Sequence, residues 1–404
     1  ASIGMLYISQ VLPLSLVGEA LFSGIDHFAL TAIPLFILTG DVLVRTGLSR
    51  KFLDVAEALT NWTRAGFGSA TVLVCGMFAA ISGSDAAGAA AVGRMTIDRL
   101  VESGYPRPYA CALVAAGACT GILIPPSIAY IVVGLILGIS ASTLFQAALI
   151  PGILILGSIL VTNSVVNRRH AYTEGNAMSV GEWFAQVGRA IVSGWYAFLV
   201  PGIIFYGIFS GKLTPTEAGA TAVVVTIIIG FIIGTLKWSD FPAMMVSSAK
   251  VNGVILPIIA MSLPLAQAMA AMGVPQGFVY SITTVTNEPW LLILMAIGIL
   301  IAAGCVMETT PNIVILAPIL YPLVVDEVGM NEIQFCIMLI TALGVGFITP
   351  PLGLNLFVVS GITGESILKI AARAIPFVFF MLLVVLLIAY VPAISTMMLP
   401  ENLR

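Results

Sequence analysis

Apolar stretches long enough to cross a membrane recur along the whole chain, separated by short polar segments. A helix of about 20 apolar residues spans the hydrocarbon core of a bilayer. Such stretches predict membrane-spanning helices near residues 1–18, 27–44, 108–138, 142–163, 193–210, 215–236, 251–272, 332–360 and 374–395. The sequence has no long segments of alternating polarity, which a transmembrane β-barrel requires. The pattern therefore predicts an all-α integral membrane protein.

The composition excludes a large soluble protein. Hydrophobic residues make up 59% of the 404 residues and charged residues only 9%, whereas a soluble domain carries roughly 25% charged residues. The net charge is −3 and no basic domain is present, which argues against a nucleic-acid partner. The five cysteines lie in apolar segments without metal-ligand or disulfide spacing, so we interpret them as small core residues.

Two apolar stretches, 66–93 and 291–324, differ from simple spans because polar residues interrupt their centres. The first centre contains Ser82, Gly83, Ser84 and Asp85, and the second contains Met307, Glu308, Thr309 and Thr310. An ionised side chain at bilayer depth is costly unless it faces a cavity or a partner. Two short helices that meet at a polar tip would bury that tip in protein at mid-membrane depth. We therefore predict that both stretches are re-entrant helical hairpins.

The distribution of Lys and Arg tests this prediction. If both stretches are re-entrant and the N-terminus is cytoplasmic, fourteen basic residues fall inside and two, Lys212 and Arg404, fall outside. The fourteen are Arg45, Arg50, Lys51, Arg64, Arg94, Arg99, Arg107, Arg168, Arg169, Arg189, Lys237, Lys250, Lys369 and Arg373. This bias follows the positive-inside rule. Arginines flank the first hairpin, which is predicted to open to the cytoplasm, whereas only acidic residues flank the second, which is predicted to open outside.

Two further stretches, 49–63 and 180–192, are amphipathic rather than spanning. Each combines basic and acidic residues with apolar ones, and each contains a tryptophan, Trp62 or Trp183. Tryptophan favours the headgroup region, and amphipathic helices lie in the interface plane. We predict that both stretches are helices at the cytoplasmic interface.

The chain contains a weak internal repeat with a period of 225 residues. This shift places Gly121, Pro125 and Pro126 on Gly346, Pro350 and Pro351, and places Glu102 and Gly104 on Glu327 and Gly329. The matches concentrate in residues that break helices. An odd number of membrane crossings separates equivalent points, so the repeats are predicted to be inverted, related by a two-fold axis in the membrane plane. Each repeat then holds a re-entrant hairpin, a helix broken at Gly-x-x-x-Pro-Pro and a following helix.

The broken helices carry the candidate chemistry. A double proline removes two N–H donors and disfavours helix at the preceding residue. The carbonyl groups left unpaired in hydrocarbon must bind a polar neighbour, water or a cation. With the tip hydroxyls they form hard oxygen ligands that suit Na⁺ or H⁺ coupling, and helix N-termini directed at the same place favour an anionic substrate. The alternative is that both breaks are proline kinks in packing helices.

Several polar residues allow two interpretations. Asp85 and Glu308 are either functional carboxylates or a structural pair. Asp41 lies near the inner end of its span and is weaker as a functional candidate, because it fits a cap. The segment 214–217 begins a helix with proline, which favours a capping role. Asn355 follows the second break and faces either a cavity or packed protein.

Five motifs along the chain belong together. They are Ile33-Pro34-Leu35-Phe36-Ile37-Leu38-Thr39-Gly40, Ser82-Gly83-Ser84-Asp85-Ala86-Ala87, Gly121-Ile122-Leu123-Ile124-Pro125-Pro126-Ser127, Thr214-Pro215-Thr216-Glu217-Ala218 and Gly346-Phe347-Ile348-Thr349-Pro350-Pro351-Leu352-Gly353. With them the chain resembles a known family, the large membrane (M) subunit of TRAP (tripartite ATP-independent periplasmic) transporters. The resemblance covers essentially the whole chain, and the motifs are specific in combination. The first span of the family begins earlier, which implies that residues precede Ala1.

The resemblance implies Na⁺ as the coupling ion, with at least two sites. The first would be formed by Ser82, Ser84, Gly121, Ile124 and Pro126, the last three through backbone carbonyls. The second would be formed by Met307, Thr309, Gly346, Thr349 and Pro351. Substrate would lie between the tips, near Asp85, Ser127, Thr310 and Asn355, with Glu308 a further intramembrane carboxylate.

The resemblance also implies a function and partners. Members use a Na⁺ gradient to take up organic acids across the bacterial inner membrane, and the likeness is greater to the sialic acid members than to the C4-dicarboxylate ones, a choice that the residues by themselves leave open. A periplasmic substrate-binding protein (P) delivers the substrate, and a small four-helix membrane subunit (Q) clamps the scaffold. The transport domain is expected to move as an elevator. The chain would divide into scaffold and arm (1–65), first transport repeat (66–163), scaffold and arms (164–272), second transport repeat (273–395) and a periplasmic tail (396–404).

Three other functions are alternatives to this one. The first is an H⁺- or Na⁺-coupled anion carrier of related inverted-repeat fold that works without a binding protein. An intramembrane enzyme is disfavoured because the sequence has no paired Asp dyad and no Ser/Lys or Ser/His set. A channel is disfavoured because hairpin tips form buried sites rather than rings of charge.

Overall fold

The computed structural model describes residues 14–63, 65–169 and 179–400, and every regular element within these ranges is a helix. The chain begins with α2 (Leu14–Ile25), η1 (Phe28–Thr31), α3 (Ala32–Arg45) and α4 (Leu48–Thr60). The first repeat holds α5 (Gly66–Ser82), α6 (Asp85–Glu102), α7 (Arg107–Ala118), α8 (Thr120–Leu123), α9 (Ile128–Leu137) and α10 (Ala141–Val166). Next come η2 (Asn167–Arg169), α11 (Val180–Phe209), α12 (Pro215–Ile233), η3 (Trp238–Asp240), α13 (Phe241–Ala271) and α14 (Val274–Thr283). The second repeat holds α15 (Pro289–Gly304), α16 (Thr309–Tyr321), η4 (Pro322–Glu327), α17 (Glu332–Gly346), α18 (Leu354–Thr363), α19 (Ile367–Tyr390) and α20 (Pro392–Thr396).

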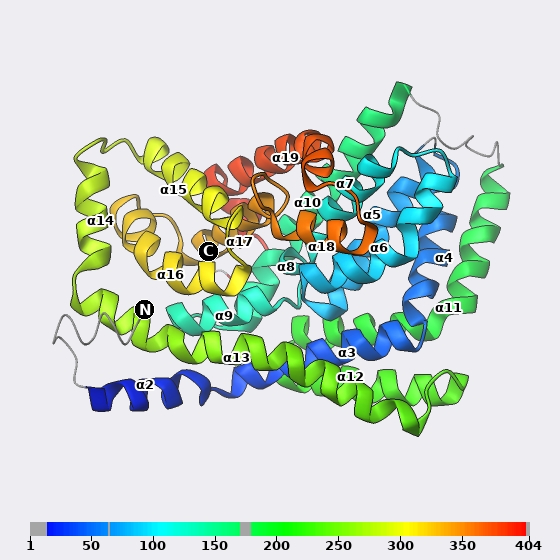
Figure 1. Cartoon of the computed structure of the whole chain (residues 1–404), viewed down its shortest axis with the longest axis horizontal. Coiled ribbons are helices and arrows are strands. Elements are labelled where there is room, and N and C mark those ends of the chain that lie inside the picture. The colour runs from blue at the N-terminus through cyan, green and yellow to red at the C-terminus, as the bar shows by residue number, and fades with distance from the viewer. Residues whose placement is uncertain (1–13, 64, 170–178, 401–404) are drawn as a thin grey trace.

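Helices α2–α4 and α11–α14 form an outer frame around a central bundle made of α5–α10 and α15–α19 (Figure 1). In the frame, α3 packs against α12 and α13, and α4 packs against α11. Gly47, with a φ of 72°, ends α3 in the left-handed region and turns the chain into α4. Phe52 of α4 then meets Phe198 of α11 edge to face, with ring centroids 5.1 Å apart. The frame therefore encloses the central bundle on three sides, as Figure 1 shows.

Both stretches with polar centres are helical hairpins, as predicted. Helix α5 ends at Ser82 because Gly83 adopts a left-handed φ of 60°, which favours glycine. Helix α6 starts at Asp85, and the Ser84 hydroxyl accepts a hydrogen bond from the backbone N–H of Ala87 as its cap. In the second hairpin, Glu308 is the extended residue that precedes α16. Each polar tip thus lies between two helices that pack against each other.

The two Gly-x-x-x-Pro-Pro motifs break their helices where the sequence predicts. Between Leu123 and Ile128 the chain is not helical, and Ser127 caps α9 through its hydroxyl. The second break separates Gly346 from Leu354. Both Pro–Pro peptide bonds are cis. The helices before and after the first break are bent by 42° relative to each other.

The 225-residue repeat is present in the structure. Helix α7 begins at Arg107 and α17 begins at Glu332, 225 positions later. The turns before them contain Gly104 and Gly329, whose φ angles are 92° and 80°. Equivalent residues therefore adopt the same unusual backbone conformation at the same place in each repeat.

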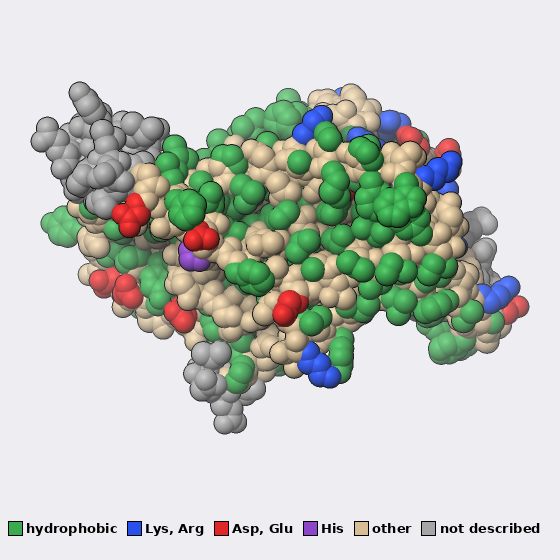
Figure 2. All heavy atoms as spheres, turned by 90° about the horizontal axis from the view of Figure 1, so that it is seen from below, with side chains coloured by type: hydrophobic (Ala, Val, Ile, Leu, Met, Phe, Trp, Pro, Cys, Tyr) green, Lys and Arg blue, Asp and Glu red, His purple; other side chains and the backbone are tan. Residues whose placement is uncertain are grey.

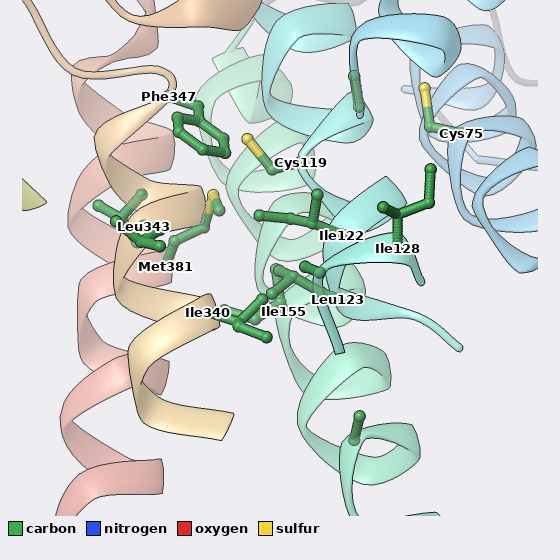
Figure 3. Close-up of a cluster of buried hydrophobic side chains, with 14 of the residues drawn as sticks. Cys75, Cys119, Ile122, Leu123, Ile128, Ile155, Ile340, Leu343, Phe347 and Met381 are labelled. Atoms are coloured by element: carbon green, nitrogen blue, oxygen red, sulfur yellow. The ribbon is translucent and has the colours of Figure 1, made fainter. Parts of the chain in front are cut away.

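The two repeats meet where their broken helices cross. The Cys119 sulfur lies 3.2 Å from the carbonyl oxygen of Gly344, a residue 225 positions later. Residues related by a two-fold axis touch only close to that axis, so the axis passes beside this pair. In the same region, Cys119 and Ile122 of the first repeat lie opposite Phe347 and Leu343 of the second (Figure 3).

The two hairpins open to opposite ends of the central bundle. Arg107, which follows the first hairpin, donates a hydrogen bond to the carbonyl oxygen of Thr363, just before α19. Trp290, which begins the second hairpin, accepts one from the Tyr390 hydroxyl at the end of α19. Helix α19 has 24 residues and is therefore about 36 Å long. The openings are separated by the length of a membrane span, which confirms the inverted arrangement.

Seven helical segments in the described part of the chain are long and apolar enough to cross a membrane, and the bent pair around the first break would be an eighth. One of the seven, Thr309–Glu327, is the second limb of the second hairpin. Large apolar side chains face outwards, among them Ile232, which is 79% exposed. Figure 2 shows one face with hydrophobic side chains spread over most of its length, acidic side chains towards one end, and basic side chains with a few acidic ones towards the other. Such a surface suits lipid rather than water.

One predicted boundary is wrong. The sequence predicts an interfacial helix over 180–192 and a separate span over 193–210, but one helix, α11, covers both. A capping box of Ser179 and Glu182 starts this helix early, and Gly194 alone does not end it. The other amphipathic stretch forms α4, and Thr214 and Glu217 form a capping box at the start of α12, as predicted. The first thirteen residues of the predicted span 1–18, Arg64 and the last four residues of the tail lie outside the described residues.

Candidate functional site

The tip of the first hairpin lies directly against the first break. The backbone N–H of Ile128 donates a hydrogen bond to the carbonyl oxygen of Gly83 over 3.3 Å. A Cβ atom on Gly83 would lie 2.8 Å from the carbonyl oxygen of Pro126, and one on Gly121 would lie 2.6 Å from the backbone nitrogen of Asp85. Both positions therefore require glycine, because no side chain fits between backbones in such close contact.

The five residues predicted for the first sodium site are neighbours at this contact. The Ser82 hydroxyl is buried and has no hydrogen-bond partner among the residues that the structure describes. Ser84 is the cap of α6, and its backbone touches Gly121. Ile124 ends α8 in an extended conformation and packs against the last turn of α5. Pro126 presents its carbonyl oxygen to the tip. Hydroxyl and carbonyl oxygens thus converge on one small region.

The second tip meets the second break in a different register. The backbone N–H of Gly353 donates to the carbonyl oxygen of Cys305 over 3.0 Å. A Cβ atom on Gly346 would lie 2.7 Å from the Cα atom of Gly304. This contact involves the end of α15, before the predicted ligands at 307 and 309. The two repeats therefore differ in how tip and break fit together.

The residues predicted for the second sodium site are less closely assembled than those of the first. The Met307 carbonyl oxygen accepts a hydrogen bond from the Asn312 amide over 2.9 Å. The Thr309 hydroxyl is buried without a hydrogen-bond partner in the described part of the chain. Thr349, in the break, donates to the carbonyl oxygen of Val345 at the end of α17, and Pro351 is exposed. The ligand set of this second site stays a prediction.

Each hairpin tip carries one carboxylate, Asp85 on the first and Glu308 on the second. Asp85 is only 4% exposed, and one of its carboxylate oxygens has no hydrogen-bond partner among the described residues. Its charge interacts with that of Glu308 in the second hairpin. Like charges repel strongly where little water is present. The region between the tips therefore favours a cation.

The residues predicted to contact substrate are buried, and two of them make hydrogen bonds within the protein. The Ser127 hydroxyl donates a hydrogen bond to the carbonyl oxygen of Ile122 and accepts one from the backbone N–H of Ala129 as the cap of α9. It therefore already acts both as a donor and as an acceptor. The Asn355 amide donates to the carbonyl oxygen of Ala115 over 3.3 Å and joins α18 to α7. Thr310 is 3% exposed at the start of α16. These residues and Asp85 are buried between helices of the central bundle, and their role towards substrate stays a prediction.

A cavity of about 230 Å³ lies between the first hairpin and the outer frame. The hairpin contributes Phe78, Ser82, Ser84, Ala87, Ala90, Ala91 and Arg94, and the frame contributes Ile37, Gly40, Asp41, Val44, Ser247, Ser248 and Val251. The cavity begins at the hairpin tip and extends along α6 to Arg94. Its lining includes none of the four residues predicted to contact substrate.

Sequence reasoning assigned no function to most of this lining. Asp41 carries a signal, because a carboxylate inside an apolar run draws attention. Arg94 appears in the sequence only as one of the flanking basic residues. Ser247 and Ser248 carry no local signal, since their position opposite the first hairpin results from the packing of α13 against α3. These residues are candidates that only the assembled helices reveal.

The chain is similar over almost its whole length to one transporter family. Residues 1–394 match the family described as the DctM component of the tripartite ATP-independent periplasmic transporter. The C4-dicarboxylate TRAP transporter large permease protein DctM of Pseudomonas aeruginosa is 35% identical over 93% of this chain and 87% of that protein. The isethionate TRAP transporter permease protein DctMQ of Oleidesulfovibrio alaskensis is 34% identical over 98% of this chain and 62% of that protein.

Two solved transporters share the fold at low sequence identity. The YdaH transporter of Alcanivorax borkumensis superimposes with a TM-score of 0.66 at 14% identity, over 96% of this chain and 90% of that one. The MtrF protein of Neisseria gonorrhoeae superimposes with a TM-score of 0.53 at 13% identity, over 93% of this chain and 83% of that one. With the hairpins, the broken helices and the match over residues 1–394, the chain belongs to the DctM family of TRAP transporter large permeases, which are multi-pass membrane transporters and not enzymes.

Proposed function

We propose that this chain is the carrier subunit of a Na⁺-coupled system that takes up a small organic anion. The observation that carries the proposal is a set of buried oxygens without partners among the described residues of the two tips, on Ser82, Asp85 and Thr309. A buried polar group left unpaired costs about 1–3 kcal/mol. Hydroxyl, carboxylate and carbonyl oxygens are the ligands of hard cations. Bound Na⁺ would satisfy these oxygens and would balance the charges of the two tip carboxylates.

The class of substrate is proposed from the relatives and from the cavity. One relative is named for C4-dicarboxylates, another for isethionate, and one from Escherichia coli, 29% identical, for 2,3-diketo-L-gulonate. All three compounds are small organic anions. The cavity of about 230 Å³ suits a molecule of this size. We therefore rank a C4-dicarboxylate or a comparably small carboxylate or sulfonate ahead of sialic acid.

Two partners are proposed with the carrier. The family is described as tripartite and periplasmic, which favours a periplasmic substrate-binding protein (P) and a small membrane subunit (Q). The exposed apolar faces of α11 and α12, with Val192 73% and Ile232 79% exposed, offer a surface for such a subunit. We place the protein in the bacterial inner membrane with its basic end in the cytoplasm, following the positive-inside rule.

We further propose that the central bundle moves against the outer frame as an elevator. Their interface contains the cavity at the first hairpin and a second cavity of about 400 Å³, which lies between η1, the start of α12 and the turn from α9 to α10. Close packing resists sliding, because interdigitated side chains must separate first. Cavities at two places along the interface therefore support a movable bundle.

Transport measurements test the proposed function. The complex with the small subunit is reconstituted into proteoliposomes, and candidate binding proteins are preloaded with succinate, isethionate or sialic acid. The expected result is uptake that requires both an inward Na⁺ gradient and a loaded binding protein. Uptake driven by a proton gradient without any binding protein would instead favour the H⁺-coupled carrier.

The Ser82→Ala variant is expected to weaken Na⁺ dependence with normal expression. Loss of one ligand oxygen worth about 1–2 kcal/mol raises the Na⁺ concentration for half-maximal uptake by about 5–30-fold. Ser84→Ala is expected to do the same and also to remove the cap of α6. Ser103→Ala is the matched control, because its exposed hydroxyl bonds only within α6. Unchanged Na⁺ titration in Ser82→Ala and Ser84→Ala would contradict the first site.

A further inference from the structure

Arg94 is a cation without a counter-ion in the cavity beside the first hairpin. It is the single Lys or Arg among the described residues that line this cavity. In the ranges that the structure covers, its guanidinium has no ion pair and no hydrogen bond. The other charged lining residue, Asp41, is already paired with Arg45 at 3.0 Å. The cavity therefore carries an unbalanced positive charge.

A track of small side chains connects Arg94 to the hairpin tip. Ser84, Ala87, Ala91 and Arg94 follow each other at spacings of three and four residues, so they lie on one face of α6. All four line the cavity. Ten residues of helix separate Ser84 from Arg94, a distance of about 15 Å. The alanines leave open space between the tip and the guanidinium.

The opposite wall limits where a ligand can go. A Cβ atom on Gly40 would lie 3.2 Å from the Cβ atom of Ser82, so α3 approaches the tip closely. Farther along the cavity, the lining of the opposite wall includes two serines of α13, Ser247 and Ser248. The Ser248 hydroxyl accepts a hydrogen bond from the Asn252 amide over 3.4 Å and keeps its own proton to donate. The wall opposite α6 is thus also suited to an anion.

We infer that Arg94, the alanine face of α6 and the α13 serines form an anion site at the cytoplasmic end of the cavity, where the carboxylate or sulfonate group of the substrate binds after it leaves the hairpin tip. The direction of substrate movement in this inference, from the hairpin tip to the cytoplasm, rests on the proposed uptake function. Guanidinium binds carboxylate and sulfonate oxygens with two parallel hydrogen bonds. The charged side chains at the two tips are carboxylates, Asp85 on the first and Glu308 on the second, and they repel an anion once Na⁺ has dissociated. Arg94 then draws the substrate towards the cytoplasm.

Charge-selective labelling of a cysteine in the cavity tests the site without requiring transport. Ala91→Cys places a thiol one turn from Arg94, and the five native cysteines are buried. Inside-out membrane vesicles are treated with 2-sulfonatoethyl methanethiosulfonate or with the cationic 2-(trimethylammonium)ethyl reagent. The measured quantity is the ratio of the two reaction rates, anionic to cationic. Arg94→Gln is expected to lower this ratio about tenfold, since one nearby charge attracts the first reagent and repels the second.

Two further variants separate the local charge from a general effect. Arg94→Lys, which keeps the charge, should retain most of the ratio. Arg50→Gln removes another exposed arginine on the same side, outside the cavity lining, and should leave the ratio unchanged. With Arg94 present, millimolar succinate or isethionate should slow labelling by the anionic reagent, and Arg94→Gln should abolish this protection.

Three results would overturn the inference: an unchanged ratio in Arg94→Gln, absence of protection by both anions, or labelling only from the periplasmic face. Labelling needs neither Na⁺ nor a binding protein. A failure of Na⁺-coupled uptake with normal charge selectivity would therefore reject the proposed function and leave the anion site intact. Na⁺-coupled uptake without charge selectivity at Ala91→Cys would reject the anion site alone.

Discussion

Gly121→Ala is expected to weaken Na⁺-coupled uptake severely while the protein still inserts and folds. The added Cβ atom would lie 2.6 Å from the backbone nitrogen of Asp85 and 2.7 Å from the backbone carbonyl of Ser84. Backbone atoms cannot rotate away as a flexible side chain can, so the whole tip must move off the first break. Overpacking of this kind costs about 1–3 kcal/mol, which is about 5–150-fold when it is expressed as lost ion affinity. Na⁺ titration of uptake measures this loss.

A glycine in the first hairpin, on α6, provides the matched control for Gly121 of α8. A Cβ atom on Gly88 of α6 would meet only the Phe78 ring, at 3.8 Å, which is an ordinary contact. Gly88→Ala should therefore keep wild-type uptake, and its helix should gain slightly in stability. Thermal unfolding of both variants separates a local displacement from general unfolding. Wild-type Na⁺ affinity in Gly121→Ala would refute the assignment of the tip and break to an ion site.

The Asp85→Asn substitution is expected to remove the stabilisation of the protein by Na⁺. The Asp85 carboxylate is buried, has an oxygen without a hydrogen-bond partner in the described ranges, and feels the charge of Glu308. Removing one partner of a buried ion pair costs about 3–5 kcal/mol, so Na⁺ binding should weaken by about 100-fold or more. Without Na⁺ the variant should be at least as stable as the wild type, because a neutral amide replaces a buried charge.

Melting temperatures measured in NaCl and in choline chloride, at equal ionic strength, provide the test. A ligand that binds only the folded state raises stability with its concentration, so Na⁺ should raise the melting temperature of the wild type and not of Asp85→Asn. Asp54→Asn is the control, since this exposed carboxylate pairs with Lys51 on α4, outside the hairpins. An undiminished Na⁺ shift in Asp85→Asn would make the carboxylate a structural group.

The hairpins and breaks could be predicted from the sequence because their causes are local. A double proline removes backbone donors wherever it stands, and a charged tip inside an apolar stretch is tolerated only when protein surrounds it. The inverted arrangement was also predictable, since the positive-inside bias records on which side each loop lies. The prediction that 180–192 is separate from the following span was wrong, because a change in polarity does not end a helix where no proline or left-handed residue interrupts it.

The candidate site was predictable only in part. Ser82, Ser84, Gly121, Ile124 and Pro126 are neighbours in the structure, as the motifs imply. The second tip uses Gly304 and Cys305 against its break, although the sequence suggested the same register as in the first repeat. The two tips differ in their residues, and an offset of 225 positions in the sequence does not specify how far one helix is displaced along its neighbour.

The sequence by itself determined the membrane environment, the helical elements, their breaks and the inverted repeat. Each of these depends on the length of an apolar stretch, on a proline or glycine, or on the charge of a loop, all of which are local properties. The tertiary structure decided that Gly121 touches the Ser84 backbone, that Ser127 and Asn355 are tied to neighbouring helices, and that Arg94 faces the serines of α13 across a cavity. Such pairings depend on how frame and bundle pack over long sequence separations, which no local pattern records.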